Sequence, residues 1–194
     1  MKKWIIWGVV GVVVLFIIIS YNGLVGKRAD AETAWSNVES SYQRRNDLIG
    51  NLVKTVQGAA DFERGTLTDV IEARAKATSV TIDPSNISPE QLAQFQQAQN
   101  SVSGALSRLL VTVERYPDLK ANQNFLELQS QLEGTENRIN VARDRYNEAV
   151  NIYDKKKRSF PNVLFAGLLG FEDMARFKSE AGAEKAPEVD FNFE

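Results

Sequence analysis

Glutamates placed along helix-forming segments are the residues of this chain that come closest to a catalytic pattern. Carboxylates from facing helices can hold a pair of metal ions, but the known di-iron arrangement also needs Glu-x-x-His pairs. The chain contains no histidine, and charged residues on helices more commonly form a solvated face. We therefore predict no metal site at the glutamates concerned, which are Glu32, Glu39, Glu127, Glu133 and Glu136.

The composition removes most other catalytic chemistry as well. Without histidine the chain lacks the commonest general base and zinc ligand, and without cysteine it lacks thiolate chemistry and disulfides. Lys and Arg number 23 against 25 Asp and Glu, whereas a surface that binds nucleic acid needs an excess of cations. The sequence therefore predicts no enzyme, no cofactor and no nucleic-acid partner.

Three polar residues, Arg45, Gln99 and Thr135, stand where apolar ones are expected. One interpretation is a polar layer inside a helical bundle, which could line a ligand site or fix the register of the helices. The other, which we favour, is that all three lie at partly exposed edges. Arg45 would then extend to water while Leu48 fills its place, and Gln99 and Thr135 would bond neighbouring side chains.

Three amphipathic segments must position these residues. Apolar residues step by alternating three and four through residues 35–59, 92–116 and 125–153, which is the spacing of core-facing positions on packed helices. The flanking residues are mostly Gln, Asn, Glu and Arg, as a solvated face requires. The pattern predicts an all-α fold, an elongated antiparallel (up-and-down) four-helix bundle.

Capping residues mark two helix boundaries. Ser88 and Gln91 form a capping box, and Pro89 suits the first helical position. Pro117 makes a short turn after Tyr116, because it cannot donate into a continuing helix and restricts the residue before it. Helices on either side of so short a turn must run antiparallel.

The joint near Gly58 and Gly65 leaves two alternatives. A capping box of Thr66 with Asp69 favours a break there. With the break the body has four helices, and the last returns towards the start of the first. Without it a single very long helix replaces two, and the last helix ends far away.

The run WIIWGVVGVVVLFIIISY, residues 4–21, carries no charge over 18 residues. A helix of that length covers roughly 27 Å, close to the hydrocarbon core of a bilayer. A cleaved signal peptide is the alternative, but Ser20 to Gly23 offers no Ala-x-Ala cleavage pattern. We predict a retained single-pass membrane anchor. Its membrane-contacting residues are Trp4, Trp7, Phe16 and Tyr21.

Topology follows from the cations that flank this run. Lys2 and Lys3 precede it, and Lys27 and Arg28 follow it, so the positive-inside bias is almost balanced. The first pair lies closer to the run. We therefore place the chain in the cell membrane with its body on the outer (periplasmic or extracytoplasmic) side.

Long stretches of the sequence, in order along nearly the whole chain, resemble the LemA family of bacterial membrane-anchored proteins. They are YNGLVGKRADAETAWSNVESSYQRRNDLIGNLVKTV, IEARAKA, ERYPDLKAN, ENRINVARDRYNEAVNIYD, FPNVLFAGLLGF and EKAPEVDF. The resemblance implies an antiparallel helical bundle behind one span and provides no catalytic residues. Relatives are often encoded beside membrane metallopeptidases or TPM-domain proteins, which implies partners of those kinds in the cell envelope.

Near the C-terminal end, four consecutive cations precede an apolar run that is too short to cross a bilayer. In one interpretation this stretch lies in the membrane interface, with the cations favouring anionic lipid. In the other, Val163, Leu164, Phe165, Leu168 and Leu169 fold back against the bundle, and the cations complement a helix C-terminus. The interface residues of the first interpretation are Lys155, Lys156, Lys157, Arg158, Phe160, Phe165, Leu168, Leu169 and Phe171.

These observations predict four parts of the chain. They are an anchor at residues 1–22, a bundle at 23–159, a membrane-proximal or bundle-capping segment at 160–177 and a mobile tail at 178–194. The tail ends in a strand-like alternation, residues 189–193, that could dock on a partner. The leading hypothesis is a non-enzymatic scaffold or adaptor of the envelope that contacts lipid and other proteins and self-assembles. The alternative is a bundle-type sensor with a small-ligand site near Arg45.

Overall fold

The computed structural model describes residues 2–58 and 62–178, and these residues form an all-helical structure without a strand. The α-helices are α1 (Lys2–Gln57), α2 (Arg64–Ser79), α3 (Pro89–Val113), α4 (Pro117–Lys120) and α5 (Gln123–Arg158). A 3₁₀ turn, η1 (Asn162–Leu164), follows α5. The predicted tail, including residues 189–193, lies outside the described residues apart from Lys178.

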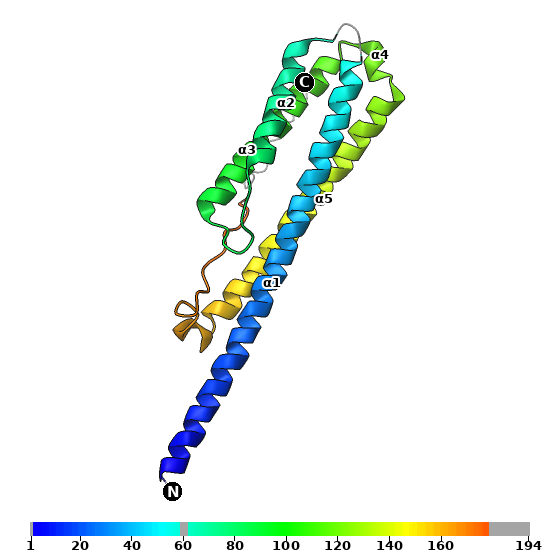
Figure 1. Ribbon diagram of the computed structural model, residues 1–194. Coiled ribbons are helices and arrows are strands. Elements are labelled where there is room, and N and C mark those ends of the chain that lie inside the picture. Colours follow the sequence, from blue (N-terminus) through cyan, green and yellow to red (C-terminus); the bar gives the residue numbers. More distant parts are fainter. Residues whose placement is uncertain (1, 59–61, 179–194) are drawn as a thin grey trace, which may run out of the picture.

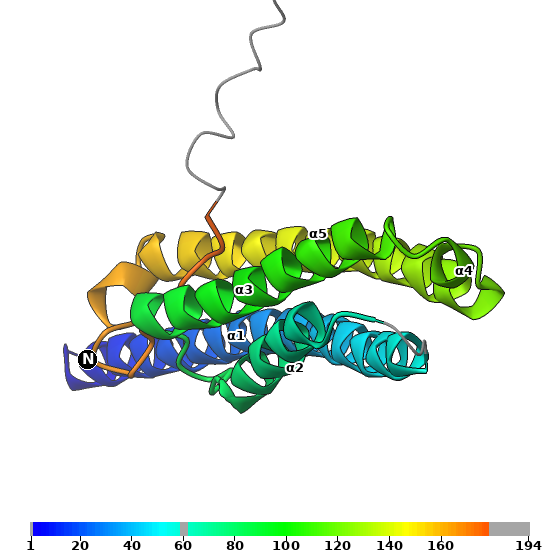
Figure 2. The same cartoon turned by 90° about the horizontal axis from the view of Figure 1, so that it is seen from above.

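Two helix pairs build the body. Helix α1 packs mainly on α5, and α2 packs mainly on α3. Figure 1 shows α1 and α5 side by side, with α1 continuing beyond the other helices towards the N-terminus, and Figure 2 shows α2 and α3 along one side of that pair. The short helix α4 connects α3 to α5 at the opposite end from the N-terminus.

The joint between the first two helices is a break. Helix α1 ends at Gln57 and α2 begins at Arg64, so the alternative of one very long helix is wrong. The predicted capping box of Thr66 with Asp69 is also wrong, because α2 starts three residues earlier, with Glu63 at the N-cap and no side-chain cap. The Thr66 hydroxyl is buried without a hydrogen-bond partner in the described structure.

The other boundaries follow their capping residues. Ser88 accepts from the backbone N–H of Gln91, and the Gln91 side chain accepts from the Ser88 N–H, which confirms the capping box. Helix α3 ends at Val113, and Pro117 lies beyond it and begins the single turn of α4. Asn122 then caps α5 by accepting from the N–H groups of Asn124 and Phe125.

The predicted apolar positions form the core. The repeating positions of α1 from Trp35 to Val56, of α3 from Leu92 to Val113 and of α5 from Phe125 to Tyr153 are buried, with Leu128 and Ala149 only partly so. Val150 is buried beside Ala149. Ala59, predicted to extend the first set, lies outside the described residues, and Tyr116, predicted to end the second set, is only half-buried and lies beyond the end of α3.

The first part of α1 presents its apolar side chains to the surroundings. Trp4 is 85% and Trp7 73% exposed, while Phe16 and Tyr21 are 41% and 43% exposed. Among the described residues this is the one helix long and apolar enough to cross a membrane, and only 6% of its most apolar 18-residue window is buried. Burial by the body begins at Ser20 and Leu24, which are 6% and 0% exposed.

Candidate functional site

A buried polar layer separates two apolar cores in the body. Arg45 of α1, Gln99 of α3 and Thr135 of α5 are 2%, 3% and 1% exposed. On each of the three helices the polar residue lies between the last residue of one core cluster and the first residue of the other. The flanking pairs are Tyr42 and Leu48, Phe95 and Val102, and Leu132 and Ile139. The three polar residues therefore lie at one level of the body.

Arg45 is the centre of this layer. Its Nη1 donates to Glu136 Oε1 at 3.0 Å and to Ser103 Oγ at 3.1 Å. Its Nη2 donates to the side-chain oxygen of Gln99 and, at 3.4 Å, to the Gln99 carbonyl. One guanidinium thus joins α1 to α3 and α5. Thr135 does not join this network, because its hydroxyl donates to Gln131 O of its own helix at 2.7 Å.

The favoured interpretation of Arg45 as a side chain that extends to water is wrong. Leu48 is buried as well, at 8% exposed, so it does not replace Arg45 in the core. The physical reason is that Arg45 finds four acceptor atoms, on three residues of two neighbouring helices, which offset the cost of removing its charge from water. Its Nε remains buried without a partner in the described structure.

The ion pair runs from the interior to the surface. The Glu136 side chain is 42% exposed, so it keeps contact with water and the desolvation cost falls mainly on Arg45. The guanidinium also lies 4.9 Å from the ring centroid of Tyr42. Burial raises the pKa of Tyr42, although the nearby cations Arg143 and Arg45 oppose the rise. The phenol therefore stays neutral beside the guanidinium.

Sequence reasoning missed two members of the network. Ser103 follows Gln99 by four residues and Glu136 follows Thr135 directly. The spacing of four residues places Ser103 on the same helix face as Gln99, and this spacing could have indicated Ser103 as a member of the network. Nothing local distinguishes Glu136 from the other glutamates.

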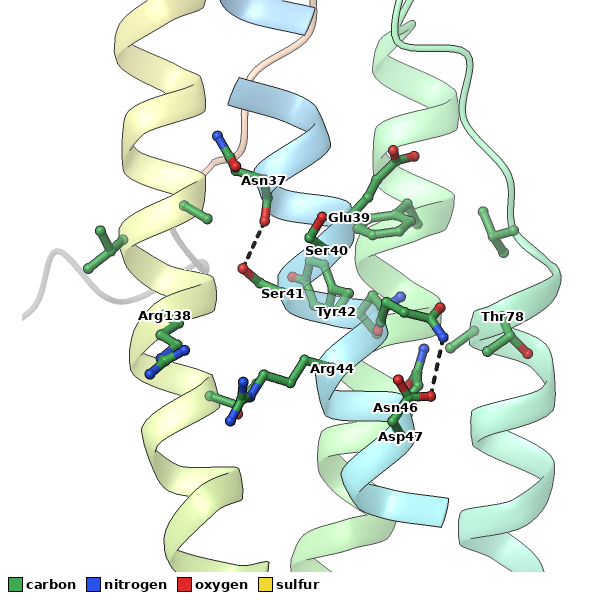
Figure 3. Close-up of a pocket in the computed structure, with 18 of the residues that line it drawn as sticks. Asn37, Glu39, Ser40, Ser41, Tyr42, Arg44, Asn46, Asp47, Thr78 and Arg138 are labelled. Atoms are coloured by element: carbon green, nitrogen blue, oxygen red, sulfur yellow. Dashed lines mark hydrogen bonds between the residues drawn. The ribbon is translucent and has the colours of Figure 1, made fainter. Parts of the chain in front are cut away.

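An open groove runs beside the layer and is lined by polar side chains of α1, α2 and α5 (Figure 3). Several of these groups bond within α1, as Ser41 does to the Asn37 carbonyl and Gln43 to Asp47. Figure 3 shows Arg44 of α1 reaching towards α5, on which Arg138 lies. The groove has the bonding pattern of a solvated helix face.

The candidate metal-binding glutamates do not come together. Glu32 pairs with Arg28 at 3.1 Å, while Glu127 and Glu133 accept hydrogen bonds from glutamines one turn away on α5. Within residues 2–58 and 62–178 no three acidic side chains are placed to share a metal ion.

A basic cluster ends α5 beside the start of the body. The Lys156 side chain lies over Gly23 of α1, with its Cε 3.4 Å from where a Cβ would stand on that glycine. Lys155, Lys156 and Arg158 are exposed. Lys157 is only 11% exposed, because it pairs with Asp173 and lies 5.8 Å from the ring centroid of Tyr153.

The carboxylate of Asp173 also takes a bond from Arg158, at 3.3 Å. These bonds, with that of Lys157 first, hold the pKa of Asp173 below its ordinary value despite some burial. Two of the four predicted interface cations are therefore partly neutralised. No acid among the described residues pairs with Lys155 or Lys156.

Residues 159–170, here called the terminal turns, follow this cluster. Their backbone folds on itself, since Ala166 N–H donates to Asn162 O at 2.8 Å and Leu169 N–H donates to Phe165 O at 3.0 Å. The side chains of the fold-back interpretation are instead exposed, with Phe165 half-buried. The exposed ones are Val163 (54%), Leu164 (66%), Leu168 (88%) and Leu169 (38%), and Phe160 before them is 80% exposed.

Phe171 does not join this exposed surface, contrary to the prediction of an interface role. It is 5% exposed and its ring packs edge-on against Tyr21, with centroids 5.5 Å apart. The reason is that Gly170 adopts a φ of +77°, which reverses the chain and directs the next residues back to the body.

Residues 171–177, here called the closing segment, lie along the core. Tyr146 and Tyr153 donate their hydroxyls to the carbonyls of Ala175 and Glu172, each at 2.8 Å. Phe177 stacks on Trp35 with centroids 5.9 Å apart. The closing segment therefore fixes where the terminal turns emerge beside α1.

An ion pair with a buried carboxylate adds to this attachment. Asp154, 7% exposed in its side chain, pairs with Arg176 of the closing segment. Sequence reasoning missed both residues, because their partnership depends on the chain reversal at Gly170.

Comparison with known proteins gives a consistent set of relatives. Residues 34–191 match the LemA family. Magnetosome protein MamQ 2 of Paramagnetospirillum magneticum is 26% identical over 185 residues, covering 87% of this chain and 68% of that protein. Magnetosome protein MamQ of Magnetospirillum gryphiswaldense is 24% identical with the same coverage. Protein LemA of Metamycoplasma hominis is 25% identical over 158 residues, covering 81% of this chain and 68% of that protein.

Proposed function

The chain belongs to the LemA family, and from this premise we propose that it is a non-enzymatic, membrane-anchored scaffold or adaptor of the bacterial cell envelope. Its body would be an antiparallel four-helix bundle of α1, α2, α3 and α5. It would act through contacts with other proteins and through self-assembly.

One observation carries this proposal: the exposed apolar run and the body share a single helix. Helix α1 has 56 residues and passes from the exposed apolar run directly into the core, where Leu24, Ala31 and Trp35 are fully buried. At 1.5 Å per residue it is roughly 84 Å long. An unbroken helix transmits position and orientation from the membrane to the body, which suits a protein that holds partners at a fixed height.

Two further observations favour a non-enzymatic role. The chain has neither histidine nor cysteine, and the most buried charged network, at Arg45, is occupied by internal partners. Partners of the kinds implied by the family resemblance, a membrane protease or a TPM-domain protein, are the first candidates. The side of the membrane is tested by single cysteines at Ser79 and Ser159, because both positions are exposed and the chain has no other cysteine.

The scaffold is tested by photo-crosslinking of the full chain in native membranes. A photoreactive residue replaces Val111 (72% exposed) or Val141 (49% exposed) in separate variants, and replacement of the buried Val38 provides the matched control. We expect discrete adducts, with a protein or a second copy, from at least one exposed position and none from the control. Absence of adducts at both exposed positions would contradict the scaffold role.

A sensor is the second candidate, and the buried layer at Arg45 is the observation that favours it. A small anionic ligand would have to displace Glu136 from the guanidinium, which is feasible because Glu136 is half-exposed. Thermal shifts across a metabolite library, wild type against Arg45→Ala, test this function. A ligand whose shift requires Arg45 supports the sensor, and a library without one argues for the scaffold.

A further inference from the structure

We propose that the terminal turns are a second membrane contact, which inserts apolar side chains into the bilayer interface beside α1 while Lys155 and Lys156 bind anionic phospholipid headgroups. The proposal rests on the membrane anchor of the preceding section. It commits to lipid, and not to a protein, as the occupant of this surface.

The first step is position. The buried ring of Phe171 packs on Tyr21, the last residue of the uncharged apolar run of α1. Ser20 is 6% exposed although Ile18 and Ile19 are 51% and 61% exposed, so the body reaches the end of that run. If residues 4–21 cross the hydrocarbon, the terminal turns lie at its boundary with the headgroups. Figure 1 shows them at the end of the body nearest the N-terminus.

The second step is the chemistry of the exposed side chains. Phe160, Leu164 and Leu168 are 80%, 66% and 88% exposed, and residues 159–171 contain no charge. Five large apolar side chains gathered in twelve residues are unusual on a surface in water. The same composition suits an element that lies in the interface without crossing it.

The third step is the backbone. An inserted segment must satisfy its own N–H and C=O groups, because water is scarce in the bilayer. In the terminal turns six N–H groups donate to carbonyls of the same segment, including those of Leu164 to Pro161 O at 3.1 Å and Phe165 to Asn162 O at 3.1 Å. The Asn162 side chain in turn donates to Lys156 O, at the end of α5.

The fourth step is charge. Lys155 and Lys156 lie in the last turn of α5, just before the terminal turns in the sequence, and have no acidic partner among the described residues. Asp173 engages Lys157 and Arg158, and the neighbouring Glu172 is exposed, so about two cations remain available to headgroups. Each would enrich anionic lipid locally by about fivefold.

The experiment uses the full chain in lipid nanodiscs. Single cysteines replace Leu168 or Leu164, and Val111, an exposed apolar residue at the far end of α3, provides the matched control. The rate of labelling by a water-soluble maleimide is normalised to the rate in denaturant. We expect protection of position 168 by about tenfold relative to 111, because labelling requires the segment to leave the bilayer and expose at least one remaining apolar side chain, such as Leu164, to water. A bilayer-depth probe at 168 should also be quenched by lipids that carry a spin label near the headgroup.

The role of lipid charge is tested by quenching of the probe at position 168 in two kinds of nanodisc. Both contain the same lipids in the same proportions, but the spin label is attached to the anionic lipid in one and to the zwitterionic lipid in the other. We expect stronger quenching by the anionic lipid, and loss of the difference in Lys155→Gln/Lys156→Gln.

Equal labelling at 168 and 111 overturns the proposal. Protection without lipid quenching, or protection that disappears when nanodiscs with one chain each are selected, also overturns it and assigns the surface to a second copy. Carbonate extraction of the same variants reports α1 anchoring separately, so failure of the anchor is distinguishable from failure of the second contact.

Discussion

Replacing Arg45 by methionine tests whether the polar layer contributes to stability through its hydrogen bonds. Methionine keeps most of the length of the side chain but removes the donors. Glu136 is 42% exposed and would turn to water at little cost, and Ser103 keeps its bond to the Gln99 carbonyl at 3.4 Å. The main loss falls on the side-chain oxygen of Gln99. This residue is only 3% exposed, and Arg45 donates to that oxygen.

The magnitude follows from that single orphaned group. A buried amide oxygen left without a donor costs about 1–3 kcal/mol, which corresponds to a fall in Tm of about 2–4 °C per kcal/mol for a chain of this size. Arg45→Met/Gln99→Leu removes both partners, so no buried polar group loses its bond. Replacing a buried polar pair by apolar side chains is often neutral or stabilising, and the double variant should return to within about 1 kcal/mol of the wild type.

The assay is urea unfolding of the full chain in detergent micelles, followed by circular dichroism. Glu136→Gln is the matched control, and it should cost less than Arg45→Met because Arg45 keeps its bonds to Gln99 and Ser103. Wild-type stability in Arg45→Met would refute the view that the layer is stabilised through Gln99. If the double variant loses as much free energy of unfolding as Arg45→Met and Gln99→Leu lose together when made separately, the cost does not come from an orphaned amide.

Three further predictions concern other parts of the body. Ser88→Ala removes the capping box of α3 and should lower the free energy of unfolding, measured with urea, by about 1 kcal/mol. Ser79→Ala, at the exposed end of α2, should leave it unchanged, and equal losses in the two variants would contradict the capping argument. Phe177→Ala removes the ring stacked on Trp35 and should lower the same free energy of unfolding by about 3 kcal/mol. A smaller loss than that of Ser88→Ala would mean that the Phe177 ring does not hold the closing segment. Burial raises the pKa of Tyr153 to about 12, so the folded state holds this proton more tightly than the unfolded chain, and stability should fall as pH rises from about 10 to about 12. Alkaline titration of Tyr153→Phe against the wild type checks this, and an unchanged fall in the variant would show that other groups cause it.

Local sequence determined the helices and their buried faces. The stepping of three and four residues predicted which positions of α1, α3 and α5 are buried, because a helix brings every third and fourth residue to one face. Ser88, Pro89 and Gln91 predicted the start of α3, because capping is a contact within one turn. The family was evident at the same stage, since it depends on the order of residues alone.

Tertiary structure decided everything that depends on partners distant in sequence. Arg45 looked like an edge residue until its acceptors Ser103 and Glu136 stood on two neighbouring helices, 58 and 91 residues away. The apolar run after α5 had a uniform composition, yet the reversal at Gly170 buried Phe171 and left Leu168 exposed. Burial of a charge or an aromatic ring depends on what the chain brings against it, and periodicity within one helix carries no information about that neighbour.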